Sequence, residues 1–157
     1  MNRERIDVVR RLREALGPRF TGGLEDNAEA QRRAPQYIYR AGTDKHSYIA
    51  LMKQHLVGVT SPGLHGSVGW KFAEYIAAAC CIVAPLLPAG QSDSFNADTN
   101  YLPWNSLDDC VDACERLLNS PDQARAMQQE NARYYARTLR PDVLLRHCID
   151  VATAHGS

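Results

Sequence analysis

Residues 64–86 read LHGSVGWKFAEYIAAACCIVAPL, and this stretch decides the fold. Apolar residues in its first part recur at helical spacing, whereas its end is a short unbroken apolar run, which is typical of a buried strand. Just before it, LVGVT at 56–60 is rich in β-branched residues and is followed by Ser-Pro-Gly, which marks a strand feeding a loop. Strand, loop, helix and strand in such short succession predict a parallel βαβ unit.

Hydrophobic periodicity and turn signals divide the rest of the chain into helices and short extended segments. We expect helices at 2–16, 44–54, 70–79, 107–119, 121–138 and 141–154, and a loop or irregular helix at 25–35. Extended segments are expected at 19–24, 37–39, 56–60, 81–86 and 100–104, with a polar loop at 88–99. This order predicts an α/β fold, a Rossmann-like three-layer domain with a mostly parallel sheet and a helical C-terminal end.

Local signals also place several helix ends. A glycine and a proline at 17–18 end the first helix, whose arginines we expect to form a solvated face. Capping boxes are expected from Ser106 to Asp109 and from Ser120 to Gln123, because a serine followed three residues later by an acidic or amide side chain can satisfy two free amides.

The length and charge of the chain limit the number of domains and the classes of ligand that we expect. The chain has 157 residues, which predicts a single domain over 1–157. Lysine plus arginine number 18 and aspartate plus glutamate number 18, so no net field favours binding to nucleic acid. No apolar run is long enough to cross a bilayer, and the N-terminus lacks the apolar core of a signal peptide. We therefore expect a cytoplasmic protein that recognises its ligand locally.

The five cysteines are expected to be reduced thiols. Cys110 and Cys114 lie one helical turn apart, where both could reach one metal ion. They also belong to an apolar stripe at helical spacing, which favours packing in the core, and the same interpretation applies to Cys148. No metal site is predicted.

The loop before the helix at 70–79 is the candidate ligand site. A helix N-terminus presents free amide N–H groups and a positive dipole end, which suits phosphate. Gly66 and Gly69 would let a ligand approach the backbone, Ser67 could add a hydroxyl, and Lys71 could add a full charge. In open α/β sheets, ligands bind outside the carboxyl ends of the strands, where this loop lies.

Three further residues have two interpretations each. Glu74 could accept hydrogen bonds from vicinal sugar hydroxyls, or it could simply favour the first half of the helix. His65 could donate to a phosphate or a sugar, although a loop histidine is more often a bystander. Trp70 could flank a nucleotide base, although packing against the body of the protein is the more frequent role for a tryptophan.

The order of these features resembles the C-terminal half of a GT-B-fold glycosyltransferase. The similarity runs from about residue 40 to residue 141: a glycine loop, a helix with a glutamate, a buried strand, a polar loop, then NYL and a helix ending in LLNSP. It is closest to the glycosyltransferase group 1-like families that include spore-coat CgeB-type proteins. The resemblance implies a Rossmann-like domain that binds a nucleotide-diphosphate sugar donor for glycosyl transfer.

The resemblance also implies roles for particular residues. Glu74 matches the glutamate that holds the nucleotide ribose, and residues 68–70 occupy the place of the family's Phe-Gly-Leu loop. The helix after the glycine loop binds the diphosphate, with Lys71 as the nearest basic side chain. The donor is a substrate rather than a cofactor, no metal is implied, and the catalytic base would come from the other half of the enzyme.

Three features depart from the family's pattern. Gly66 stands where many relatives carry an additional glutamate that touches the transferred sugar. The segment AAACC at 77–81 lacks the glycine that usually follows the alanines, which predicts a strained or altered corner. The family also has an acceptor-binding N-terminal domain and a central strand before the helix at 2–16, which we expect to be supplied by a preceding segment or a partner chain.

Three functions therefore compete. The first is the donor-binding half of a glycosyltransferase, inactive in transfer as this chain alone. The second is a non-catalytic interaction module that kept the fold, which Gly66 and the absent acceptor domain favour. The third, a generic flavodoxin-like nucleotide-binding protein, fits less well because its phosphate loop normally follows the first strand.

Overall fold

A computed structural model describes residues 3–42, 44–62, 69–87 and 95–154. Within these residues a parallel sheet has the order β1-β2-β3. The strands are β1 (Val57–Val59), β2 (Cys81–Pro85) and β3 (Leu102–Trp104). Helix α4 (Trp70–Ala77) connects β1 to β2, so the predicted parallel βαβ unit is confirmed.

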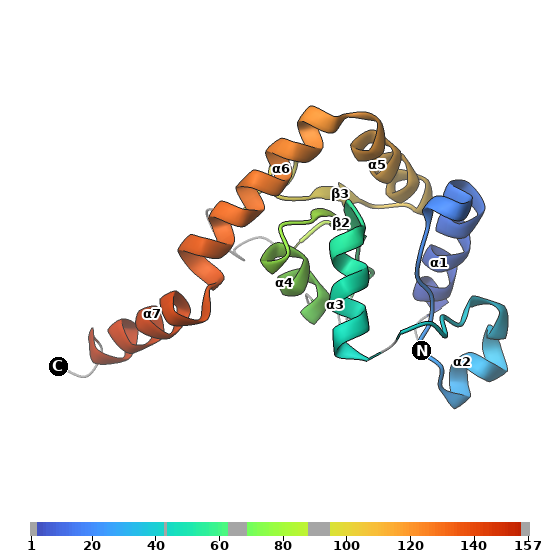
Figure 1. The fold of residues 1–157 in the computed structure, drawn as a ribbon, viewed down its shortest axis with the longest axis horizontal. Helices are drawn as coiled ribbons and strands as arrows, with labels where there is room; N and C mark the ends of the chain where they lie inside the picture. The colour runs from blue at the N-terminus through green and yellow to red at the C-terminus, as the bar shows by residue number, and fades with distance from the viewer. Residues whose placement is uncertain (1–2, 43, 63–68, 88–94, 155–157) are drawn as a thin grey trace.

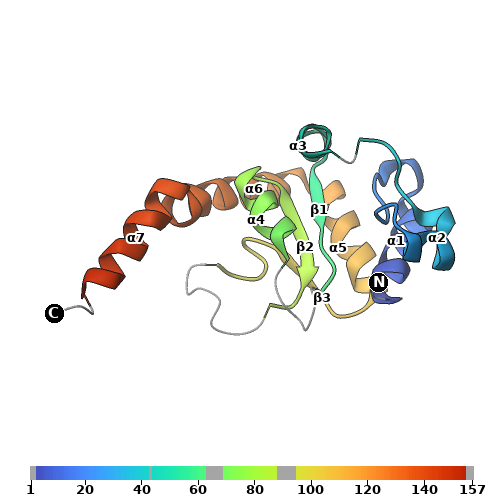
Figure 2. The same cartoon turned by 90° about the horizontal axis from the view of Figure 1, so that it is seen from below.

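The helices cover both faces of this sheet (Figures 1 and 2). Helices α1 (Arg3–Leu16) and α5 (Leu107–Asn119) lie on one face, and α4 lies on the other. Helix α6 (Pro121–Tyr134) contributes to both layers, while α2 (Ala28–Arg33) packs beyond α1. Helix α3 (Lys45–Gln54) precedes β1. The predicted three-layer α/β class is therefore confirmed.

The central strand β2 explains the unbroken apolar run. Cys81 and Val83 belong to the core cluster with α1 and α5, whereas Ile82 and Ala84 belong to the cluster with α4. All four are completely buried. A strand of a parallel sheet covered on both faces has no solvent-facing positions, so alternation disappears from its sequence.

Of the three helix ends that the sequence predicts from local signals, two are confirmed: the end of α1 and the start of α5. Gly17 adopts φ +54°, a left-handed conformation that ends α1 at little steric cost. At α5, the Ser106 hydroxyl accepts from the Asp109 amide and the Asp109 carboxylate accepts from the Ser106 amide, so this capping box is confirmed. The box predicted from Ser120 is wrong: its side chain makes no capping hydrogen bond, and the side-chain oxygen Oε1 of Gln123 accepts from the Arg116 guanidinium at 2.9 Å instead.

The strands predicted at 19–24 and 37–39 are wrong. They meet in an isolated parallel bridge between Leu24 and Ile38, and Pro35–Tyr37 is a 3₁₀ turn. The Arg13 guanidinium donates to the Gly22 carbonyl at 3.0 Å and to the Gln36 carbonyl at 2.7 Å. A side chain thus satisfies backbone groups that a strand partner would otherwise take, and Arg13 does not belong to a purely solvated face.

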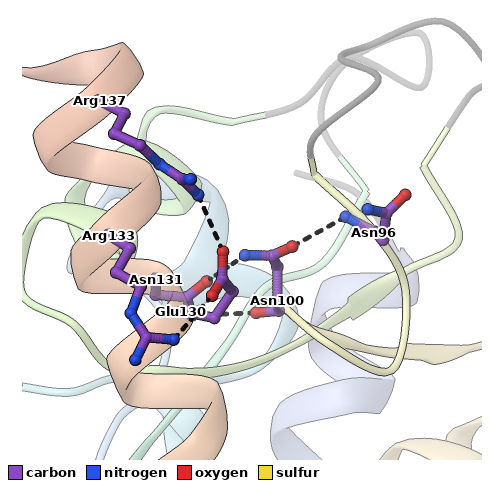
Figure 3. Close-up of polar contacts among 6 residues, drawn as sticks. All are labelled: Asn96, Asn100, Glu130, Asn131, Arg133 and Arg137. Atoms are coloured by element: carbon purple, nitrogen blue, oxygen red, sulfur yellow. Dashed lines mark hydrogen bonds and ion pairs between the residues drawn. The ribbon is translucent and has the colours of Figure 1, made fainter.

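Two buried asparagines fasten the amino ends of β2 and β3 (Figure 3). The Asn131 amide on α6 donates to the Cys80 carbonyl at 2.9 Å and to the Asn100 carbonyl at 3.0 Å. The Asn100 side-chain amide in turn donates to the Asn131 side-chain oxygen at 3.1 Å, and the Asn100 side-chain oxygen accepts from the backbone N–H of Asn96. Asn100 and Asn131 are 1% and 0% exposed, so this network replaces water completely.

The corner between α4 and β2 is strained, as the missing glycine predicts. Ala79 has φ +52°, in the left-handed region that disfavours any residue with a Cβ. The Ala79 amide donates to the Ile76 carbonyl, and the next amide, that of Cys80, donates to the Tyr75 carbonyl. These bonds hold the turn in a conformation that glycine would adopt without strain.

Replacing Ala79 with glycine is expected to stabilise the protein by about 0.5–1 kcal/mol, because relief of left-handed strain exceeds the added freedom of the unfolded chain. Urea denaturation measures this gain. The matched control is Ala73→Gly, which introduces the same change at an exposed position inside α4 and should destabilise by about 0.5–1 kcal/mol. Destabilisation by Ala79→Gly as well would show that the corner is not strained.

The C-terminal part differs from the prediction in two respects. The helix expected over 121–138 changes after Tyr134 into a π-helical turn, Tyr135–Leu139. Helix α7 (Pro141–Ala154) then projects from the body and has no buried residue, so Cys148 is exposed and its predicted core role is wrong. None of the described helices is long and apolar enough to cross a membrane.

Candidate functional site

The candidate site lies at the carboxyl end of β1, where the chain passes through Thr60 and later enters α4. The Thr60 amide donates to the Val83 carbonyl of β2 at 2.9 Å, which extends the sheet one residue past β1. Of the predicted site residues, Gly69, Trp70, Lys71 and Glu74 are described. His65, Gly66 and Ser67 lie outside the described residues, so their assignments stay predictions.

Gly69 is the residue that precedes α4. Its φ of −74° and ψ of 157° are extended, and a Cβ placed there would meet nothing within 4 Å. Glycine is therefore not needed for the backbone conformation, but it leaves the helix end uncovered. Among the described residues no side chain caps this end, which suits the first amides of α4 to an anion.

Trp70, in the first turn of α4, is 90% exposed. The expectation that it packs against the body of the protein is therefore wrong. Its position beside the uncapped helix end leaves the aromatic face available to a planar ligand group, the other interpretation of this residue.

Two cations meet beside this helix end. The Arg5 guanidinium of α1 donates to the Ser61 hydroxyl, just past β1, at 3.3 Å. Desolvation by the surrounding protein lowers the pKa of Lys71, and the charge of Arg5 lowers it further, against the opposing effect of Glu74 and Glu25. Arg5 and Lys71 are thus close enough to repel one another, which is the electrostatic setting that an anion relieves.

Glu74 lies one turn further along α4 and forms an ion pair with Lys45 of α3. The Lys45 side chain is 67% exposed and the Glu74 side chain 28% exposed. An ion pair with so exposed a lysine contributes little to stability, so a ligand can displace Lys45 at low cost. Glu74 therefore has a fixed position on α4, and its carboxylate can exchange Lys45 for a hydrogen-bond donor of a ligand.

Two tyrosines lie near the ion pair of Lys45 and Glu74. Lys45 Nζ and Lys71 Nζ lie 5.9 and 5.8 Å from the centre of the Tyr48 ring, within the range of cation–π contacts. Burial, with Tyr75 and Glu74 nearby, raises the pKa of Tyr48. The Tyr75 ring crosses β1 at Gly58, where a Cβ would come within 2.7 Å of the ring, so glycine is required there for close packing.

The cysteines play no part in this site. Cys110 and Cys114 are 1% and 2% exposed and belong to the core cluster, so their predicted packing is confirmed. The Cys110 thiol and burial both raise the pKa of Cys114, which keeps it protonated. Across the part of the chain that the structure describes, no group of three or more His, Cys, Asp or Glu side chains is placed to hold a metal ion.

Arg5 and Lys45 were missed by sequence reasoning. Hydrophobic periodicity places Arg5 on the polar side of α1 with the other arginines, and no local pattern separates it from them. Arg5 and its partner Ser61 are 56 residues apart in the chain, and Lys45 and Glu74 are 29 apart. Only the packing of α1 and α3 around β1 brings these side chains to the candidate site.

Comparison with known proteins agrees with the α/β fold. The profile of the glycosyl transferase-like family matches residues 5–149. A sucrose-phosphate synthase from Thermosynechococcus elongatus has a similar fold, with a TM-score of 0.60 and 18% sequence identity. That match covers 96% of this chain and 44% of the synthase chain, so this chain spans less than half of its length. Among curated proteins, none matches the sequence. The chain belongs to the glycosyl transferase-like family.

Proposed function

We propose that this chain binds a nucleotide-diphosphate sugar and serves as the donor-binding half of a glycosyltransferase. The observation that carries the proposal is the convergence of Arg5, Lys71 and the uncapped N-terminus of α4 at the carboxyl end of β1. A diphosphate placed there would receive amide hydrogen bonds and neutralise two neighbouring cations.

The remaining site residues fit the other parts of such a donor. Glu74 would accept hydrogen bonds from the ribose hydroxyls after displacing Lys45, and exposed Trp70 would flank the base. In transfer, the cations and the helix dipole would stabilise the charge of the leaving diphosphate. The acceptor and the catalytic base would come from a second domain or chain. The finer placement beside CgeB-type proteins rests on motif order alone.

Glu74→Gln tests the proposal. Titration calorimetry with UDP-, GDP- and ADP-linked sugars should show binding of at least one donor, weakened about 10-fold or more by the substitution, because a hydrogen bond to a charged group contributes about 1.5–3 kcal/mol. Lys45→Met is the matched control, since it removes the competing ion pair but keeps the carboxylate. That variant should bind as well as the wild type or better.

The absence of heat with every donor, or equal affinity of Glu74→Gln and the wild type, would reject donor binding at this site. Donor binding without transfer, even when a GT-B acceptor domain is supplied, would instead favour the non-catalytic interaction module. The family assignment stands in either case, because it rests on the sequence match.

A further inference from the structure

Tyr48 on α3 has a hydroxyl group that the folded chain leaves unpaired. The hydroxyl oxygen is buried, and among the described residues no atom forms a hydrogen bond with it. A hydroxyl that gives up water without gaining a partner costs free energy. It would therefore bind a neighbouring acceptor if that acceptor became free.

The Tyr48 ring stands among the charged groups of the candidate site. Lys45 lies one turn before it on the same face of α3, and the Lys45 ammonium is 5.9 Å from the centre of the ring. From α4, the Lys71 ammonium is 5.8 Å from the same centre. Glu74 follows one turn later on α4, and its carboxylate is bound by Lys45. Tyr48 thus faces the part of α4 that carries both ligand-binding side chains (Figure 1).

Two acceptors are near the hydroxyl, the Glu74 carboxylate and the Tyr75 phenol. Burial, with Tyr75 and Glu74 nearby, raises the pKa of Tyr48, so its hydrogen stays on the oxygen at neutral pH and can be donated. A hydrogen bond to a carboxylate is stronger than one to a neutral phenol, so Glu74 is the preferred acceptor. In this structure the carboxylate is engaged by Lys45 instead.

We infer that Tyr48 is a positioning residue, which replaces Lys45 as the partner of Glu74 when a ligand binds. The inference rests on the proposed function, in which ribose hydroxyls displace Lys45. The departing ammonium leaves acceptor positions open on the carboxylate, which can accept about four hydrogen bonds. The phenol donates to one of them and holds the carboxylate in place, while the ribose hydroxyls donate to others. Tyr48 therefore acts through Glu74 rather than on the donor itself.

Donor affinity in a cycle of variants tests this exchange. In the wild type the new hydrogen bond forms only on binding, so Tyr48→Phe should weaken binding of the donor about 10-fold. In Lys45→Met the bond already exists before binding, so Tyr48→Phe should weaken binding less than about 3-fold. A ring that only packs would give the same loss in both backgrounds.

Tyr37→Phe is the matched control for Tyr48→Phe. The Tyr37 ring also contacts a cation, with the Arg13 guanidinium 5.6 Å from its centre, but it packs in the cluster of α1 and α2 rather than against α4. This variant loses the same hydroxyl group from a similar setting. It should leave donor affinity unchanged in both backgrounds.

A spectroscopic measurement tests the exchange without a donor. In protein whose tyrosines carry ¹³C at Cζ, the Tyr48 resonance is assigned with Tyr48→Phe. Lys45→Met should move this resonance downfield, because the phenol gains a carboxylate acceptor. Combining Lys45→Met with Glu74→Gln should return the resonance toward its wild-type position.

Two outcomes would overturn the inference: an unchanged Tyr48 resonance in Lys45→Met, or an equal loss of affinity from Tyr48→Phe in both backgrounds. Both are distinguishable from a failure of the proposed function. If no donor binds, the proposed function fails, and the resonance alone decides whether Tyr48 takes the place of Lys45.

Discussion

Replacing Asn131 with leucine is expected to lower the free energy of unfolding by about 3–5 kcal/mol, because it leaves several buried polar groups unpaired at about 1–3 kcal/mol each. The groups that lose a partner are the carbonyls of Cys80 and Asn100 and the side-chain amide of Asn100. Leucine is close to asparagine in size, so the loss arises mainly from hydrogen bonding. Urea denaturation at neutral pH measures it.

The control for this variant is Gln129→Leu, an exposed position on the same helix, which should change stability by about 0.5 kcal/mol or less. A loss below about 1 kcal/mol for Asn131→Leu would show that the network contributes little beyond packing. Because Asn131 lies at the amino ends of β2 and β3, folded Asn131→Leu protein should bind donor as the wild type does.

Asn131→Asp gives the same network a pH dependence. The new carboxylate would face two carbonyl oxygens in a buried site, which should raise its pKa above the ordinary value. With a raised pKa the folded state binds more protons, so this variant should gain stability as the pH falls toward 4 and lose it as the pH rises. Denaturation between pH 4 and 8, compared with the wild type, measures the difference.

Neutralising both cations, in Arg5→Gln with Lys71→Met, is expected to weaken donor binding at least about 100-fold, because each charge-assisted hydrogen bond to a phosphate contributes about 1.5–3 kcal/mol. The dependence of wild-type affinity on salt should also flatten in the double variant, since screening acts on the lost charges. Titration calorimetry at two salt concentrations measures both effects.

Arg32→Gln with Lys53→Met is the matched control, since it changes net charge equally at exposed positions on α2 and α3. An equal loss of affinity in this control would mean that only overall charge matters.

The lowered pKa of Lys71 also predicts how donor affinity depends on pH. The positive charge of Lys71 is lost at lower pH than that of an ordinary lysine. Donor affinity should therefore fall as the pH rises into the alkaline range, and Lys71→Met should remove that dependence.

Local patterns were sufficient for the framework of the fold. The apolar run of β2, the helical spacing of α4 and the serine before α5 each depend on residues close together in the chain, and each was predicted correctly. The strands expected near Leu24 and Ile38 failed because Arg13 supplies the hydrogen bonds that a strand partner would provide. That competition involves distant residues, which no local window includes.

The sequence by itself determined the parallel βαβ unit, the strained or altered corner within residues 77–81 and the helix that carries Lys71 and Glu74, because these depend on spacing and on steric preferences within a few residues. Only the tertiary structure decided that the charge of Arg5 acts on Lys71 and that Lys45 forms an ion pair with Glu74. The physical reason is that these arrangements arise where helices distant in the chain pack around one sheet, and charge and burial depend on such neighbours.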